Sequence, residues 1–125
     1  MRLLLDTHVL LWWLGDNPAL NADARSAISE RSNLVYVSAV SVWEIVIKQG
    51  LGRLHLPSNW FEVLAEEPLR RLAVSWEHAL GVGQLPDAHK DPFDRLLLAQ
   101  CLAEDLTLVT HDSTFQQYDV PLLMT

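Results

Sequence analysis

The sequence is poor in cysteine, in basic residues and in long apolar runs, and each shortage excludes a class of protein. The single cysteine, Cys101, rules out an internal disulfide or a metal site built from cysteines. Because Cys101 lies in an apolar helical stretch, we expect it to be buried as a small hydrophobic side chain. Nine Lys and Arg residues against sixteen Asp and Glu give a net charge of −7. This argues against broad nucleic-acid binding through a basic surface, but it leaves room for a local basic rim.

No apolar stretch approaches the roughly 20 residues that a membrane-spanning helix needs. The first acid, Asp6, also comes too early for a secretory signal peptide, so we expect a cytoplasmic protein with no membrane contact. The 125 residues allow one domain with a sizeable core, and no repeat or linker divides them. We therefore expect a single domain over residues 1–125.

Strand-like and helix-like segments alternate along the chain. The expected strands cover residues 3–5, 34–37, 69–74, 106–109 and 120–123. The expected helices cover residues 7–14, 19–30, 38–49, 58–66, 77–82 and 93–104, followed by a helical turn at 113–117. This alternation predicts an α/β fold with a central, mostly parallel sheet of four or five strands flanked by helices on both faces.

Four acidic residues stand at or shortly after the ends of apolar segments: Asp6, Glu44, Asp94 and Asp112. The carboxyl ends of parallel strands meet at one edge of a sheet, where open α/β sheets place their sites. Acids that are distant in sequence are therefore expected in one pocket. Carboxylates without basic partners repel one another, and a divalent cation is the simplest remedy.

Each acid also has a purely structural interpretation. Asp6 and Asp112 are suited to cap the helices that follow them. Glu44 lies three residues after Ser41, which is the spacing of a capping box. Asp94 falls in the first turn of its helix, where negative charge suits the helix dipole. Capping alone, however, does not require all four acids to lie at the same predicted edge.

An oxygen-only donor set favours Mg²⁺ or Mn²⁺ over Zn²⁺, because the sequence offers no cysteine pair and no histidine pair at helical spacing. Such a site lowers the pKa of a bound water and holds it for in-line attack on phosphorus. His8 and His111 adjoin the acids closely enough to touch a substrate, although a solvent-facing or core position is the simpler interpretation of each histidine.

Four segments resemble a known family: LLDTH at residues 4–8, residues 38–48 with Trp43-Glu44, HKDPFDRLLLAQ at residues 89–100, and LVTHD at residues 108–112. They closely resemble PIN domains, and within these the chain is similar to the VapC-type ribonuclease toxins of bacterial type II toxin–antitoxin pairs. The segment DPFDRLL is the most specific of the matches, and the likeness runs over nearly the whole chain.

The resemblance implies a PIN-like three-layer fold and a Mg²⁺- or Mn²⁺-dependent endoribonuclease that leaves a 5′-phosphate and a 3′-hydroxyl. By the same match, Asp6, Glu44 and Asp94 take the positions of three acidic metal ligands, and Asp112 takes that of a fourth acid. Thr110 would orient the acidic cluster through its hydroxyl. The resemblance also implies a homodimer and a cognate antitoxin that covers the acidic groove.

Basic and hydroxyl residues beside the acids are the candidate substrate contacts: Thr7, Lys48, Arg95 and Thr110, with Arg53 and Lys90 as further members of a basic rim. Lys48 has an alternative, an ion pair with Glu44 four residues earlier on the same helix face. Asp91 precedes Pro92 and is expected to cap a helix rather than to bind metal.

The five tryptophans are expected mostly in or near the core, with an exposed subset around Trp12-Trp13 or Trp60-Phe61 that would suit a dimer or antitoxin contact.

Other classes fit less well. A phospho-acceptor receiver domain needs an acidic pair after the first strand and a lysine after the last, and residues 121–125 contain no lysine. A haloacid-dehalogenase-type phosphatase needs a second aspartate two residues after the first, where His8 stands. A PIN-like domain that binds RNA or protein without cutting is the remaining alternative, and the presence of all four acids counts against it.

Overall fold

The computed structural model describes residues 1–86 and 91–125. Within these ranges it contains one five-stranded sheet with the order β3-β2-β1-β4-β5, and every neighbouring pair of strands is parallel. The strands are β1 (Arg2–Leu5), β2 (Leu34–Ser38), β3 (Arg70–Leu72), β4 (Thr107–Thr110) and β5 (Leu122–Met124). The predicted parallel sheet is confirmed. His89 and Lys90 lie outside the described residues, and with them the candidate phosphate contact of Lys90.

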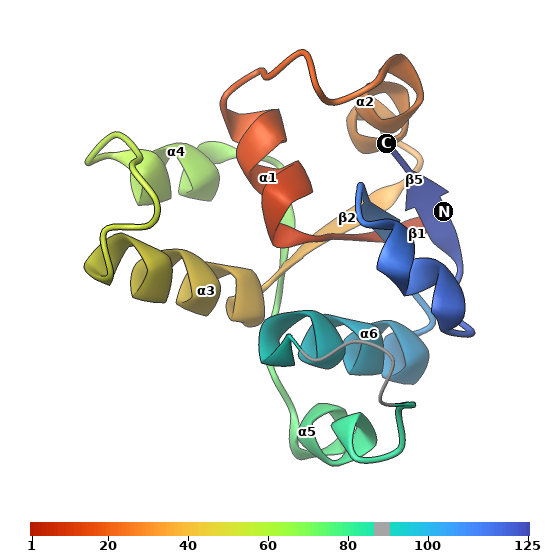
Figure 1. Ribbon diagram of the computed structural model, residues 1–125. Helices are drawn as coiled ribbons and strands as arrows, with labels where there is room; N and C mark the ends of the chain where they lie inside the picture. Colours follow the sequence, from red (N-terminus) through yellow and green to blue (C-terminus); the bar gives the residue numbers. More distant parts are fainter. Residues whose placement is uncertain (87–90) are drawn as a thin grey trace.

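Helices connect the strands and lie on both sides of the sheet (Figure 1). They are α1 (Thr7–Leu14), α2 (Ala22–Ser29), α3 (Ala39–Gly50), α4 (Trp60–Glu66), α5 (Trp76–Val82), α6 (Pro92–Glu104) and the 3₁₀ helix η1 (Ser113–Gln117). Helix α2 begins three residues later than predicted, because the Asn21 side chain caps it by accepting the Ala24 N–H at 2.9 Å. Strand β3 is shorter than predicted because it is an edge strand that pairs only with β2. None of the described helices is long and apolar enough to cross a bilayer.

Alternate residues of β1 face two separate hydrophobic cores. Leu3 and Leu5 pack in one core with residues of α1, α2 and α3, whereas Leu4 packs in the other with residues of α6 and β4. All three leucines are fully buried, and burial of one leucine stabilises the fold by about 1.5–3 kcal/mol. Cys101 lies in the second core, and burial raises the pKa of its thiol to about 12, which confirms the hydrophobic role predicted for it.

Strands β1, β2 and β4 lead into helix N-termini at the same edge of the sheet. Asp6 follows β1, Ser38 ends β2, and Asp112 lies two residues after the end of β4. Each of the three is an N-cap whose side chain accepts a backbone N–H from the first turn of the next helix. Polar side chains from three distant segments are thereby collected at one place.

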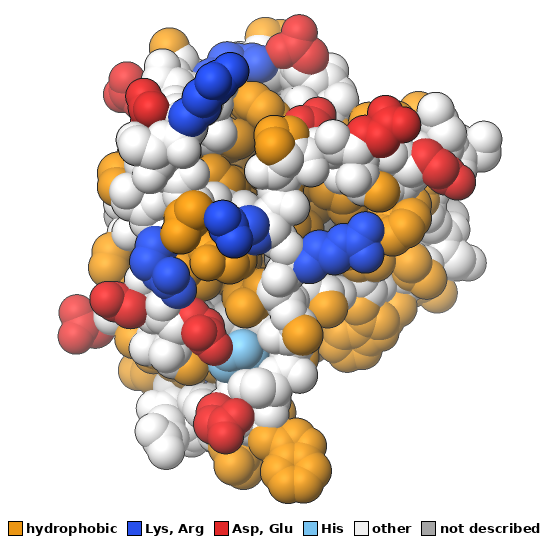
Figure 2. All heavy atoms as spheres, turned by 180° about the vertical axis from the view of Figure 1, so that it is seen from behind, with side chains coloured by type: hydrophobic (Ala, Val, Ile, Leu, Met, Phe, Trp, Pro, Cys, Tyr) orange, Lys and Arg blue, Asp and Glu red, His pale blue; other side chains and the backbone are white. Residues whose placement is uncertain are grey.

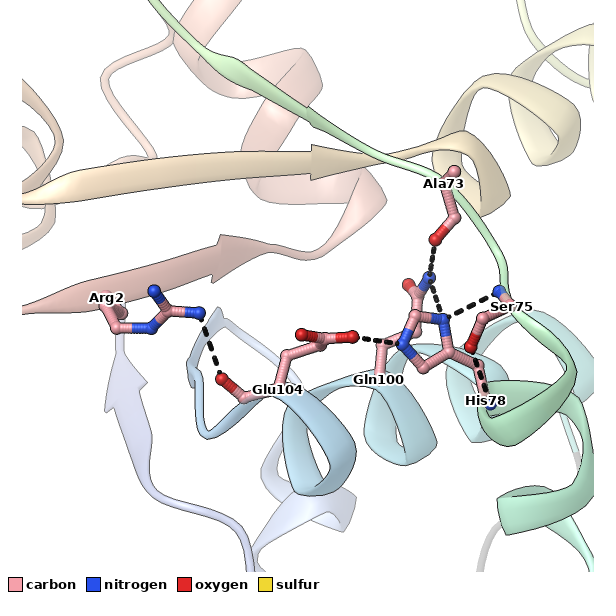
Figure 3. Close-up of polar contacts among 6 residues, drawn as sticks. All are labelled: Arg2, Ala73, Ser75, His78, Gln100 and Glu104. Carbon is pink, nitrogen blue, oxygen red and sulfur yellow. Dashed lines mark hydrogen bonds and ion pairs between the residues drawn. The ribbon is translucent and has the colours of Figure 1, made fainter.

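Helix α5 is tied to α6 and to the segment after β3 by the buried side chain of His78 (Figure 3). His78 Nδ1 accepts the Ser75 backbone N–H at 3.0 Å, so the ring proton is on Nε2, which donates to Glu104 Oε1 at 2.8 Å. Gln100 Nε2 donates to the Ala73 carbonyl at 3.3 Å. His78 is therefore a hydrogen-bonded core histidine that fixes the position of α5 on α6.

The exposed tryptophans are not the ones predicted. Trp76 is 87% exposed and Trp43 is 52% exposed, whereas Trp12, Trp13 and Trp60 are partly buried against the first core. Trp76 is the first residue of α5, and the Trp43 ring lies edge-on to that of Phe93, at 4.9 Å between centroids. The face turned away in Figure 1 also carries basic side chains set among apolar ones (Figure 2).

A candidate acidic active site at the sheet edge

The structure brings the four predicted acids to one edge of the sheet. They come from the loop after β1, from the middle of α3, from the first turn of α6 and from the loop after β4. Burial first, and then the negative charges of Asp91, Glu44, Asp6 and Asp112, raise the pKa of Asp94 to about 8. Because the charges of the other three predicted acids all act on the pKa of Asp94, the four carboxyl groups form one electrostatic cluster.

Asp6 is buried, and each of its two carboxylate oxygens has a partner. It is only 6% exposed. Its Oδ1 accepts the Val9 N–H at 2.9 Å, which caps α1, and its Oδ2 accepts the Thr110 hydroxyl. Burial raises the pKa of Asp6, these two hydrogen bonds oppose that rise, and the charge of Glu44 adds to it. The capping interpretation of Asp6 is correct, yet it accounts for only one of the two oxygens.

Glu44 is buried inside α3 and does not form a capping box. Ser38 caps this helix, so Ser41 and Glu44 lie within it, and the capping-box interpretation is wrong. Glu44 is 5% exposed, and its Oε1 accepts the Thr7 hydroxyl at 2.7 Å. The Thr7 Oγ1 also lies 2.9 Å from the Ser41 Oγ. Thr7 therefore links the start of α1 to the acid on α3.

Lys48 forms an ion pair with Glu44, one helical turn away on α3. The Nζ of Lys48 is in contact with Glu44 Oε2, which confirms the alternative proposed for this residue. The hydrogen bond to Glu44 raises the pKa of Lys48, and the charges of Glu44, Asp91 and Asp94 raise it further. The Lys48 ammonium is thus the nearest charge compensation that the described residues show for the cluster.

Asp91 and Asp94 have different roles at the start of α6. Asp91 is the N-cap, and its Oδ1 accepts the N–H groups of Phe93 at 2.9 Å and Asp94 at 3.1 Å. Pro92 occupies the first helical position, as is favoured there. The prediction that Asp91 caps the helix is confirmed, and Asp94 is the acid that this helix contributes to the cluster.

Thr110 connects Asp6 with Asp112. Its hydroxyl donates to Asp6 Oδ2 and accepts the Asp112 backbone N–H at 3.1 Å, and Thr110 is completely buried. Asp112 Oδ1 accepts from the N–H and the hydroxyl of Thr114, at 2.9 and 2.7 Å, so Asp112 does cap η1 as its structural interpretation predicts. The Thr110 hydroxyl is thus bonded to two segments of the cluster, and the orienting role that the family resemblance implies for it stays a prediction.

The donor chemistry of the cluster fits a hard divalent cation, because all four candidate ligands are carboxylates. A desolvated carboxyl with a pKa of about 8, surrounded by other acids, is a group that a cation would stabilise. However, among residues 1–86 and 91–125, no three Asp, Glu, His or Cys side chains are arranged as a ready metal-binding group. The oxygens of Asp6 accept from Val9 and Thr110, and those of Glu44 are in contact with Thr7 and Lys48. Direct coordination of an ion by these acids stays a prediction.

A pocket of about 290 Å³, lined by both polar and apolar side chains, adjoins the cluster. Its lining residues come from α1, α3 and the turn after α3: Thr7, His8, Leu11, Glu44, Ile45, Lys48, Arg53 and Leu54. Lys48 and Arg53 place positive charge around it and His8 adds an imidazole, although the chain as a whole is acidic. Two members of the predicted basic rim therefore line one cavity beside an acid.

Arg95 has a structural role in the part of the chain that is described. Its guanidinium donates to the carbonyls of Pro86, Val82 and Leu85, at 2.7, 3.0 and 3.3 Å. These bonds fasten the segment after α5 to α6. A phosphate contact from Arg95 stays a prediction that the observed bonds do not favour.

Two features of this edge were not foreseen. Ser41 is completely buried beside Thr7, although its spacing from Glu44 suggested only a cap. Trp12 packs between two histidines, 6.3 Å from the ring of His8 and 5.2 Å from that of His111. The four-residue interval from His8 to Trp12 indicates one helix face, but the approach of His111 depends on the sheet.

The chain belongs to the PIN domain family. The model of that family matches residues 3–121. The match covers all four acids, and the five-stranded parallel sheet is the fold that the resemblance predicted.

Three relatives show which members of the family are similar. Ribonuclease VapC22 of Mycobacterium tuberculosis (strain ATCC 25618 / H37Rv) is 31% identical over 122 residues, which cover 94% of this chain and 92% of that protein. The crystal structure of VapBC2 from Rickettsia felis bound to a DNA fragment from their promoter contains a chain with a TM-score of 0.77 at 17% identity, covering 99% and 98% of the two chains. VapBC-5 from Mycobacterium tuberculosis, described as a member of the VapBC family of toxin–antitoxin systems, gives a TM-score of 0.60 at 19% identity, covering 99% and 98%. The similarity is thus to VapC-type PIN domains along the whole chain.

Proposed function

We propose that the chain is a single PIN domain over residues 1–125 that acts as a metal-dependent endoribonuclease, the cytoplasmic toxin of a toxin–antitoxin pair. One observation carries this proposal: Asp6, Glu44, Asp94 and Asp112 lie at one edge of the sheet of a PIN domain, where the Thr110 hydroxyl links Asp6 to Asp112 and the other three acids raise the pKa of Asp94. The similarity to a protein named Ribonuclease VapC22 supports RNA as the substrate. The all-carboxylate donor set supports Mg²⁺ or Mn²⁺ as the cofactor.

Asp6, Glu44 and Asp94 would hold the ion, with Asp112 as the fourth acid. When bound, a divalent cation in this position lowers the pKa of a coordinated water and compensates charge on the phosphate. Attack of water on phosphorus with cleavage of the P–O3′ bond leaves the expected 5′-phosphate and 3′-hydroxyl. Among residues 1–86 and 91–125, none beside the acids is an obvious general base, so the metal would supply the nucleophile.

The residues around the acids would position them and the RNA. Thr110 and Thr7 donate hydrogen bonds to Asp6 and Glu44, so their predicted substrate-binding role becomes one of orienting ligands. Lys48 and Arg53 face the pocket of about 290 Å³ and would bind phosphate groups of the RNA there.

Removal of metal tests the enzymatic proposal against a PIN-like module that binds RNA without cutting it. The purified chain should cleave RNA in the presence of Mg²⁺ or Mn²⁺, lose that activity in excess EDTA, and regain it when Mg²⁺ is added back. The readout is the appearance of fragments with 5′-phosphates on a denaturing gel. RNA binding with no cleavage under any of these conditions would favour the module.

The antitoxin surface that we propose is an apolar groove of about 480 Å³ between α3, α4 and the edge strand β3. It is lined by Val37, Ser38, Ala39, Val42, Trp43, Phe61, Leu64, Ala65, Leu69, Arg70, Arg71, Leu72 and Ala73. The groove begins where β2 meets α3, which is the edge that carries the acids, and two arginines at its wall suit an acidic flank on the partner. A partner segment that occupies it would be apolar with acidic ends, and it would continue toward the acids.

Ala65 offers a direct test of this surface, because it is exposed on α4 and lines the groove. Ala65→Arg should weaken binding of the antitoxin encoded beside this chain by roughly 100-fold, because it buries a charge in an apolar contact. The measurement is a titration of the antitoxin into each variant, with Leu102→Ala as a control at an exposed position on α6. Equal binding by Ala65→Arg and wild type would contradict the assignment.

We also propose, from the family resemblance, that the chain forms a homodimer. Trp76 and Leu80 are 87% and 75% exposed, four residues apart on α5, and they are the surface that we assign to it. A monomeric mass by light scattering at micromolar concentration would contradict this.

A further inference from the structure

The Glu44 carboxylate already has one partner on each of its oxygens. Its Oε1 accepts the Thr7 hydroxyl at 2.7 Å, and its Oε2 is in contact with the Lys48 ammonium. Both partners belong to this chain, and Glu44 is 5% exposed. A divalent cation that used Glu44 as a ligand would therefore have to take over an oxygen that Lys48 now occupies.

The burial of Glu44 shows whether its ion pair with Lys48 is an incidental pair on the helix surface or whether Lys48 acts as a counter-ion. Glutamate at i and lysine at i+4 on a solvated helix stabilise each other by only a few tenths of a kcal/mol. Here the Glu44 side chain is 6% exposed and that of Lys48 is 35% exposed. A buried carboxylate without a counter-charge is strongly disfavoured, so this pair compensates a charge that water cannot reach.

The Lys48 ammonium also interacts electrostatically with the two acids at the start of α6. The charges of Asp91 and Asp94 act on it in addition to that of Glu44. The pair therefore lies inside the acidic cluster and supplies it with positive charge, which is the electrostatic task that a divalent cation would perform there.

We propose that Lys48 is the resting counter-ion of the acidic cluster, and that its ammonium group competes with the divalent cation for Glu44. This inference rests on the proposed function, since it concerns the metal that the proposed reaction needs. When the cation takes Glu44, the ammonium group of Lys48 remains beside Arg53 in the pocket of about 290 Å³, where a phosphate group of the RNA is its next partner. Lys48 would therefore pair with Glu44 in the absence of metal and contact a phosphate of the RNA once metal is bound.

The test is the affinity of metal-free protein for Mn²⁺, measured by isothermal titration calorimetry in wild type and Lys48→Met. Methionine keeps an unbranched chain and a good helix propensity but carries no charge. We expect Lys48→Met to bind Mn²⁺ about tenfold more tightly, which corresponds to loss of one competing charge contact. We also expect its melting temperature to fall without metal, because Glu44 is then uncompensated, and to rise more than that of wild type when Mn²⁺ is added.

Two matched variants separate competition from a general change of charge. Arg53→Met removes one positive charge from the same pocket without removing the partner of Glu44, and it should change Mn²⁺ affinity by less than about threefold. Lys48→Arg keeps the charge and should bind Mn²⁺ no more tightly than wild type. The counter-ion role of Lys48 would be overturned if Lys48→Met and Arg53→Met gained Mn²⁺ affinity equally, or if Lys48→Met gained none.

The same titration distinguishes failure of this inference from failure of the proposed function. Binding of Mn²⁺ by wild type with no change in Lys48→Met would overturn the role of Lys48 alone. Absence of Mn²⁺ binding in wild type and in every variant would overturn the metal site on which the enzymatic proposal depends.

Discussion

Replacing Asp94 with asparagine should reduce RNA cleavage by roughly 100-fold or more while the chain stays folded. Asparagine has nearly the same shape as aspartate, but it carries no charge to hold a divalent cation. Asp94 is the acid that α6 contributes to the cluster, and burial together with four neighbouring acids raises its pKa to about 8, a cost that a bound cation would offset. The measurement is the single-turnover rate on a labelled RNA in Mg²⁺, with circular dichroism as the check on folding.

Asp91→Asn is the matched control for this experiment. It makes the same chemical change three residues away, but Asp91 caps α6 through the N–H groups of Phe93 and Asp94, and asparagine is an equally good N-cap. Its cleavage rate should stay within about threefold of wild type. Equal losses in the two variants would show that the start of α6 matters as structure, and would contradict a special role for Asp94.

The metal-free wild type should become less stable as the pH rises from about 4 to 8, and Asp94→Asn should remove much of that loss. The pKa of Asp94 is raised from 3.8 to about 8 in the folded chain. Between these values the folded state holds a proton that the unfolded state has released, so rising pH favours unfolding. Above pH 8 the variant should be more stable by on the order of 1–3 kcal/mol, and below pH 4 the two should unfold alike.

Mn²⁺ should reverse the order of the two stabilities. Wild type gains stability by binding the ion, whereas Asp94→Asn lacks a ligand and gains less. Thermal unfolding at pH 8.5, with EDTA and then with excess Mn²⁺, measures both effects. Asp119→Asn controls for removal of one negative charge from the exposed surface, and it should shift neither curve. A variant at position 94 that is less stable than wild type in EDTA would contradict the electrostatic account of the cluster.

Much of the fold was predictable because aspartates that cap helices mark where those helices begin. Asp6, Asp91 and Asp112 cap the helices that follow them, as their sequence positions indicate. The apolar run of β1 predicted a strand buried on both faces, and its leucines do enter two cores. The edge strand β3 was predicted too long, because the apolar character of residues 69–74 does not reveal that only Arg70–Leu72 find a partner strand.

The four acids of the site were predictable from topology, but their partners were less so. A parallel sheet predicts that strand ends meet, and the influence of all four acids on one pKa agrees with that prediction. The capping box at Ser41 and Glu44 was wrong because Ser38 caps α3 three residues earlier. Local spacing could not decide between these two serines, since the choice depends on where β2 ends.

Exposure was the least predictable property. Trp76 and Trp43 occur in apolar stretches that suggest a core, yet the structure leaves both side chains largely in solvent. Arg95 follows an acid of the site in sequence, yet its guanidinium turns to the carbonyls after α5. Both depend on which elements pack next to one another, and a single sequence does not contain that information.

Titration of Mn²⁺ into metal-free wild type and Asp6→Asn tests the central claim most directly, because Asp6 lies at the centre of the sheet edge and lacks a nearby lysine partner among the described residues. We expect wild type to bind Mn²⁺ and Asp6→Asn to lose at least about tenfold in Mn²⁺ affinity. Equal binding of Mn²⁺ by the two proteins would contradict a metal site formed by these acids.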